Sequence, residues 1–110
     1  MKEIKFIGQT LNSIKSFPQA AKQDAGFQLS EVQQGKNPED WKPMSSIGAG
    51  VREIRIKEST GIYRVIYIAK FKNTIYVLHA FKKKSQKTSK PDIDAAKKAY
   101  KEILEEQNNG

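Results

Sequence analysis

The sequence predicts an α+β domain in which helices pack on a mainly antiparallel sheet. Three strand-like segments follow one another between residues 51 and 81 with only short turns between them, which favours an antiparallel meander. Two helical segments precede this meander and one follows it. The length of 110 residues fits one domain over residues 1–110, and 37% hydrophobic residues suffice for a small core.

The first expected elements are a short strand and a helical hairpin. Residues 2–7 alternate between apolar and charged side chains, as half-buried strands do. From Thr10 the apolar spacing becomes helical, and Phe17-Pro18 interrupts it because the residue before proline avoids helical geometry. Pro18 suits the start of a second helix and Gly35 its end. The apolar stripe of that helix comprises Ala21, Ala25, Leu29 and Val32.

The remaining elements follow from breakers, apolar runs and a capping pattern. Residues 36–50 contain prolines and glycines, and the sequence predicts a loop there. Strands are expected over residues 51–57, 62–69 and 74–81. The last of these is expected in the sheet interior because both of its faces are apolar. Ser89 and Asp92 have the spacing of a capping box, which predicts the C-terminal helix.

The charge of the chain indicates an anionic partner. Lys and Arg number 20 against 12 Asp and Glu, which gives a net charge of +8. This charge suits nucleic acid, an acidic protein or an anionic membrane surface. With no cysteine and one histidine, neither a metal site nor a cofactor is expected. No apolar stretch approaches the roughly 18 residues of a membrane span, and the N-terminal MKEIKFIG is unlike a signal peptide, so a cytoplasmic location is expected.

A cluster of lysines follows directly on the strand expected at residues 74–81. Its members are Lys82, Lys83, Lys84, Lys87 and Lys90. Concentrated positive charge at the end of a strand predicts a phosphate-binding site. Arg52, Arg55 and Arg64 lie on the two preceding strands, and we expect them to converge on the same place. The alternative interpretation is a solvated basic loop.

Two polar residues interrupt the apolar strands. Arg64 is costly inside an apolar strand unless it is paired or lines a cleft. An ion pair with Glu53 on the neighbouring strand would satisfy it and is compatible with phosphate binding. His79 is more typical of a hydrogen-bonded core residue, and proton transfer at the end of the strand is the alternative.

Arginine and lysine can cleave RNA without a metal ion. Attack by the RNA's own 2′-hydroxyl requires a base for its proton, cations for the charge that develops on the phosphate, and an acid for the leaving 5′-oxygen. A lysine whose pKa is lowered by neighbouring cations can act as the base.

Four segments resemble the RelE/HigB-type toxins of bacterial toxin–antitoxin modules, most closely the phage-derived HigB-like branch. They are DWKPM (40–44), IGAGVREIRI (47–56), YRVIYIAKF (63–71) and LHAFKKKSQKTSKPDI (78–93). The resemblance extends from about Lys5 to Leu104. It implies a RelE-like microbial RNase fold and an mRNA interferase, an endoribonuclease that in many members cleaves mRNA on the translating ribosome. It also implies a helix-turn-helix antitoxin as partner.

The resemblance also assigns expected site residues by position. It implies that Arg64 contacts phosphate, that Arg55 matches a basic residue on the preceding strand, and that Lys83 occupies the basic position after the last strand. Some members carry a catalytic tyrosine or histidine after that strand, whereas SQKTSK here has no aromatic residue, which leaves lysine as the expected base. Further phosphate contacts are expected from Arg52, Lys82, Lys84 and Lys87.

Two other functions remain open from the sequence. One is a non-nucleolytic toxin that acts on DNA gyrase, as the related ParE-type toxins do, and the other is a basic RNA-binding domain without catalysis. The antitoxin is expected either at the cationic site or, slightly favoured, on the exposed face of the N-terminal helices. That face is marked by Gln23, Gln28, Glu31 and Gln34.

Overall fold

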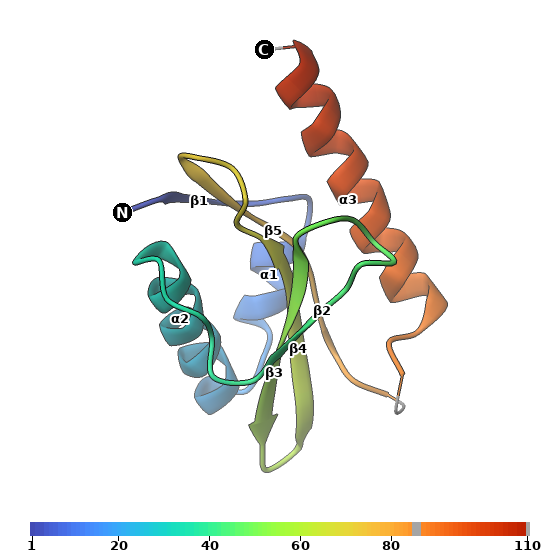
Figure 1. The fold of residues 1–110 in the computed structure, drawn as a ribbon. Helices are drawn as coiled ribbons and strands as arrows, with labels where there is room; N and C mark the ends of the chain where they lie inside the picture. Colours follow the sequence, from blue (N-terminus) through green and yellow to red (C-terminus); the bar gives the residue numbers. More distant parts are fainter. Residues whose placement is uncertain (85–86, 110) are drawn as a thin grey trace.

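The computed structural model describes residues 1–84 and 87–109 and has the predicted α+β architecture (Figure 1). Its elements are β1 (Glu3–Phe6), α1 (Thr10–Lys15), α2 (Gln19–Gln33), β2 (Trp41–Pro43), β3 (Val51–Glu58), β4 (Gly61–Ile68), β5 (Thr74–Lys82) and α3 (Lys90–Asn109). The predicted helical hairpin, three-strand meander and C-terminal helix are all present. The short strand β2 was not predicted.

The strands form a single five-stranded sheet in the order β1-β5-β4-β3-β2. The meander β3-β4-β5 is antiparallel, and β1 pairs with β5 in parallel. β5 therefore lies inside the sheet, as its two apolar faces predicted. The strand at the exact middle of the order is β4.

The prediction of a loop over residues 36–50 is wrong for Trp41–Pro43, which form β2. Trp41–Pro43 pairs antiparallel with β3, and this pairing sets Lys42 opposite Glu53. The strand is short and lies at the sheet edge, where proline is tolerated because no further strand needs its missing N–H. β2 brings Lys42 to the charged part of β3.

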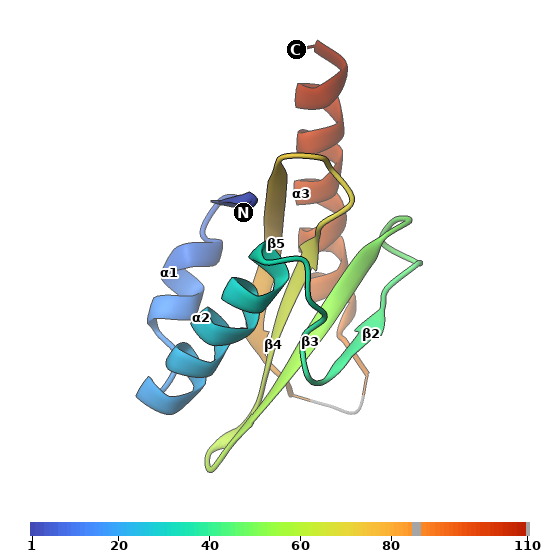
Figure 2. The ribbon, with the colours of Figure 1, turned by 60° about the vertical axis from the view of Figure 1, so that its left-hand side comes forward.

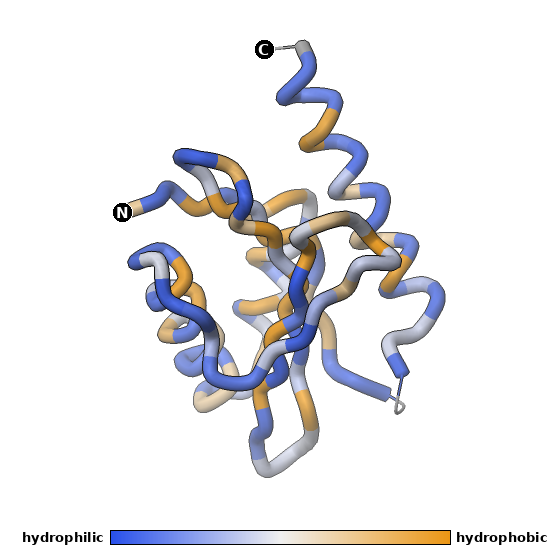
Figure 3. The backbone as a smooth tube through the Cα atoms, viewed as in Figure 1, coloured by the Kyte–Doolittle hydropathy of each residue, from blue (hydrophilic) through white to orange (hydrophobic). Residues whose placement is uncertain are grey.

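The helices cover both faces of the sheet, with α1 and α2 on one face and α3 on the other (Figures 1 and 2). The hydrophobic core beneath α1 and α2 includes Ala25, Leu29, Ile54, Val65 and Val77. A second core beneath α3 includes Ile66, Ile68, Leu78, Ala96 and Ile103. In Figure 3 the hydrophobic colours accordingly follow the strands and the inner sides of the helices, whereas the connections are mostly hydrophilic.

The local signals at the ends of α2 and α3 behave as predicted. Gly35 follows α2 with φ +86°, the left-handed conformation that glycine adopts at helix ends. At the start of α3, the Asp92 N–H donates to Ser89 Oγ at 3.3 Å and the Ser89 hydroxyl donates to Asp92 Oδ2 at 2.7 Å. This reciprocal arrangement fixes where α3 begins relative to the end of β5.

Candidate functional site

A row of charged side chains lies on the α3 face of the sheet. Arg55 stands directly opposite Arg64, and Lys42 directly opposite Glu53. Residues that oppose each other in an antiparallel pair project from the same face. Lys83 extends the row beyond β5, because its N–H donates to the Ile62 carbonyl at 2.7 Å. These five residues, Lys42, Glu53, Arg55, Arg64 and Lys83, are called the basic cluster below.

A buried ion pair forms the base of the cluster. The Arg64 guanidinium pairs through Nη1 with Glu53 Oε1, and the two residues are 1% and 0% exposed. The Thr88 hydroxyl donates to Glu53 Oε2 at 2.8 Å and thereby ties the segment before α3 to the pair. The predicted Arg64–Glu53 ion pair is confirmed. Because Arg64 is covered in this conformation, its charge acts on the cluster from below the surface.

The exposed cations of the cluster are Lys42 and Arg55. Lys42 Nζ lies 3.8 Å from Glu53 Oε1, and Arg55 Nη2 lies 2.9 Å from Asp40 Oδ1. Both basic side chains are 38% exposed. The Arg55–Asp40 pair is exposed on both sides and contributes only about 0–1 kcal/mol, so a phosphate group can displace the Asp40 carboxylate from Arg55. Lys42 is not among the site residues predicted from the sequence, because the sequence predicts a loop over its segment.

Lys83 has an ammonium group with a lowered pKa. Its side chain is half-buried, and this burial lowers the pKa of its ammonium group below the ordinary value. The positive charges of Arg64, Lys42 and Arg55 lower the pKa further, and the Glu53 carboxylate acts in the opposite direction. The cluster therefore makes the ammonium group of Lys83 easier to deprotonate than that of a lysine in solvent.

Two of the predicted phosphate contacts lie on the opposite face of the sheet. Arg52 opposes Tyr67, and Lys82 opposes Tyr63 with its ammonium 5.9 Å from that ring. The expectation that Arg52 converges with Arg55 and Arg64 is wrong, because side chains alternate along β3 and positions 52 and 55 project oppositely. Any contact of Lys82 with RNA is likewise separate from the basic cluster.

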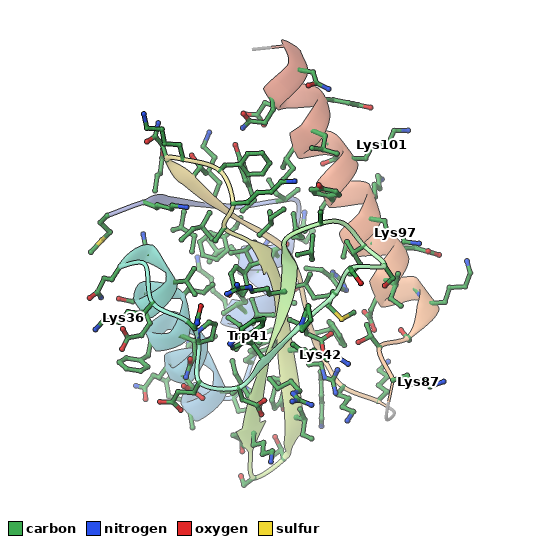
Figure 4. All side chains as sticks on the ribbon, in the orientation of Figure 1. Lys36, Trp41, Lys42, Lys87, Lys97 and Lys101 are labelled. Carbon is green, nitrogen blue, oxygen red and sulfur yellow. The ribbon has the colours of Figure 1, made fainter. Side chains whose placement is uncertain are left out.

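The lysines beyond β5 lie near the cluster at the surface. Lys84 and Lys87 are exposed, and Ser85 and Gln86 between them lie outside the described residues. Figure 4 shows Lys42 and Lys87 on the side of the sheet where α3 lies, and Lys36 beside α2. Phosphate contacts by Lys84 and Lys87 stay a prediction.

His79 anchors the start of α3. Its Nε2 lies 2.7 Å from Asp92 Oδ1, and its ring stacks on Phe81 with 5.3 Å between centroids. The interpretation as a hydrogen-bonded residue is confirmed, although the side chain keeps 24% exposure. Lys83 follows His79 by four positions, and in an extended strand this places their Cα atoms about 13 Å apart. Proton transfer by His79 stays a prediction, and at this separation it would not occur directly with Lys83.

The chain matches a known family over most of its length. Residues 12–101 match the family described as "Phage derived protein Gp49-like". The protein belongs to this family. The structure of this Gp49-like protein is similar to that of Escherichia coli toxin RelE, solved in the free state with two arginines replaced by alanine. The TM-score is 0.61 at 17% identity, over 93% of this chain and 97% of the other.

The similarity to RelE confirms the fold that the sequence resemblance implied. At this level of identity it is the fold that is shared. The comparison with curated proteins gave no match. Among the described residues of the Gp49-like chain, no group of three His, Asp or Glu side chains could hold a metal ion, and no helix is long and apolar enough to cross a membrane.

One residue predicted for the exposed face of the N-terminal helices lies elsewhere. Gln28 is only 3% exposed, because its Oε1 accepts a hydrogen bond from the Glu39 N–H at 2.9 Å. Its inclusion in an exposed face is wrong. The exposed side of α2 instead presents Gln23, Phe27 and Gln34, and Phe27 is 53% exposed.

Proposed function

We propose that this protein is the toxin of a type II toxin–antitoxin system and that it cleaves mRNA on the translating ribosome as a metal-independent endoribonuclease. The observation that carries the proposal is the basic cluster. Lys42, Arg55 and Lys83 surround the buried Arg64–Glu53 pair on one face of a RelE fold. A half-buried lysine with a lowered pKa beside exposed cations supplies both proton transfer and charge stabilisation.

In the proposed reaction the RNA's 2′-hydroxyl attacks the adjacent phosphorus. Neutral Lys83 accepts the hydroxyl proton, the 2′-oxygen–phosphorus bond forms, and the bond from phosphorus to the 5′-oxygen breaks. Arg55 and Lys42 stabilise the charge that develops on the phosphate. The leaving oxygen takes a proton from solvent, and the products carry a 2′,3′-cyclic phosphate and a 5′-hydroxyl.

Arg64 acts as a positioning residue in this scheme. It holds the Glu53 carboxylate, and its charge contributes to the low pKa of Lys83. The expected direct contact between Arg64 and phosphate would require the segment carrying Thr88 to move, because Thr88 contacts both members of the ion pair. We therefore expect direct contact between Arg64 and phosphate only in a rearranged, RNA-bound state.

The pH dependence of cleavage tests Lys83 as the base. A base acts in its neutral form, so the single-turnover rate should rise with pH and level off at an inflection below the lysine value of about 10.4. The substitution Lys42→Met removes a charge that lowers the pKa of Lys83 and should move the inflection to higher pH. Lys57→Met is the matched control, since Lys57 is an exposed lysine on β3 that lies outside the basic cluster. If Lys42→Met leaves the inflection at the same pH, Lys83 is not the general base.

The salt dependence of RNA binding tests the exposed lysines. The logarithm of the affinity for a non-cleavable 2′-O-methyl RNA oligonucleotide should fall with log salt by about 0.7 per phosphate contact. Lys84→Gln and Lys87→Gln should each make the slope shallower by about that amount. Fluorescence anisotropy measures the affinity at each salt concentration. A flat response in the parent protein would exclude phosphate recognition at this surface.

Amide exchange tests where the antitoxin binds. We propose a helix-turn-helix antitoxin on the exposed side of α2, where Phe27 offers apolar contact area on an otherwise polar surface. Adding the antitoxin should protect amides around residues 23–34. Protection confined to residues 82–90 would instead place the antitoxin over the basic cluster.

A reconstituted translation reaction tests the proposed activity. Purified protein should cut mRNA on programmed ribosomes in the presence of a metal chelator and leave 5′-hydroxyl ends. A parallel supercoiling assay with DNA gyrase addresses the gyrase alternative. Inhibition of gyrase with intact mRNA would contradict the proposal, and binding of RNA without cleavage would leave only the RNA-binding function.

A further inference from the structure

A cavity of about 280 Å³ lies on the face of the sheet opposite the basic cluster, at the end of α2 and beside β3 and β4. Its walls include Lys2, Lys36, Asn37, Arg52, Tyr67 and Lys70. None of the described residues that line it carries a carboxylate. The walls therefore carry net positive charge, with Lys2 Nζ donating to the Ala69 carbonyl at 2.5 Å and Lys70 Nζ to the Tyr100 hydroxyl at 3.2 Å.

Arg52 and Tyr67 form the inner wall of this cavity. They oppose each other in the β3–β4 pairing and so project from the same face. Arg52 Nη1 donates to Asn37 Oδ1 at 2.9 Å, which uses one of the five N–H donors of the guanidinium. The guanidinium also lies over the Trp41 ring, 4.0 Å from its centroid, which fixes the plane of the donors.

Tyr67 is fully buried, and its hydroxyl has no acceptor for its proton among the described residues, with the Arg52 guanidinium as the neighbouring donor. Burial raises the pKa of this phenol, and hydrogen bonding from Arg52 and its positive charge act in the opposite direction. The phenol is therefore protonated at neutral pH and can donate. A buried donor without a partner is costly, and here it lines a cavity in which a ligand could accept its hydrogen bond.

We propose that this cavity binds a phosphate group, either as free phosphate or as a phosphate of an RNA chain. A guanidinium fork and a phenolic hydroxyl from two residues that line the same cavity match the acceptor oxygens of phosphate. Lys36 lies at the rim, where its ammonium pairs with the Glu31 carboxylate at 3.4 Å. Binding of an RNA phosphate rests on the function proposed above, whereas binding of free phosphate does not.

Trp41 supplies a built-in reporter for the test, because it is the only tryptophan of the chain and stacks under Arg52. Inorganic phosphate is titrated while the fluorescence of Trp41 is recorded, with sodium chloride holding the ionic strength constant. The parent protein should give a saturable change. Tyr67→Phe removes only the hydroxyl whose proton has no acceptor, so it should fold normally and bind phosphate about tenfold more weakly or worse.

Lys57→Gln serves as the matched control, since it removes one positive charge from an exposed position outside the cavity and should leave the affinity unchanged. Absence of a saturable change in the parent would overturn the proposal. Equal affinity in the parent and in Tyr67→Phe would also overturn it. Acetate binding as tightly as phosphate would replace phosphate with a carboxylate, such as one from a protein partner.

A 2′-O-methyl hexanucleotide, which cannot undergo 2′-hydroxyl attack, distinguishes the two sources of phosphate. Tighter binding than inorganic phosphate, weakened by Tyr67→Phe, would assign the cavity to RNA. Phosphate binding combined with oligonucleotide binding that Tyr67→Phe leaves unchanged would assign it to free phosphate. Neither titration measures cleavage, so failure of this site and failure of the proposed ribonuclease activity are separate results.

Discussion

Lys83→Met is expected to lower the rate of mRNA cleavage by about 10²–10⁴-fold, the usual contribution of a general base. The substitution keeps the length of the side chain and removes the group that accepts the 2′-hydroxyl proton. Lys83 is half-buried at the end of β5 and its backbone hydrogen bond to Ile62 is unaffected, so the fold should persist. Single-turnover cleavage on programmed ribosomes and a thermal melt measure the two properties separately.

Lys82→Met is the matched control for this prediction. Lys82 is the preceding residue, carries the same charge, and projects from the other face of the sheet beside Tyr63. Its loss should change cleavage far less than the loss of Lys83. Equal losses from the two substitutions would mean that overall charge, and not the basic cluster, drives the activity.

Arg64→Met is expected to lower the free energy of unfolding by about 3–5 kcal/mol, because it leaves the Glu53 carboxylate buried without its guanidinium partner. Small domains have a total stability of about 5–15 kcal/mol, so the loss would be a large share of it. Urea denaturation of the purified variant measures the change. Full stability in Arg64→Met would show that Lys42 and Thr88 alone satisfy Glu53.

The double variant Glu53→Met with Arg64→Met separates stability from activity. With both charges removed, no buried charge lacks a partner, and most of the lost stability should return. Cleavage should still be impaired, because Arg64 lowers the pKa of Lys83 by more than Glu53 raises it, and both charges are absent. A double variant that is stable and fully active would show that the pair has no part in catalysis.

Much of the fold is predictable because its signals are local. The apolar stripe of α2, the break at Phe17-Pro18 and the capping box of Ser89 and Asp92 each lie within a few neighbouring residues. The antiparallel meander follows from short turns between apolar runs. The parallel pairing of β1 with β5 joins segments about seventy positions apart, and no local pattern specifies such a partner.

The candidate site was predicted less completely than the fold. The alternation of side chains along β3 already separates Arg52 from Arg55, so that error was avoidable from the sequence. Lys42 was missed because prolines and glycines surround a strand of only three residues. The burial of Arg64 depends on Glu53 and on Thr88 from a distant segment. This three-way contact cannot be recognised from the spacing of residues in the sequence.

Mapping of mRNA 5′ ends after induced expression tests the central claim most directly. The parent protein should produce new 5′-hydroxyl ends within translated regions, and Lys83→Met, expressed to the same level, should produce none. Lys82→Met should retain the cleavage pattern. Growth arrest by the parent protein with no new 5′ ends would contradict an mRNA endonuclease built on the basic cluster.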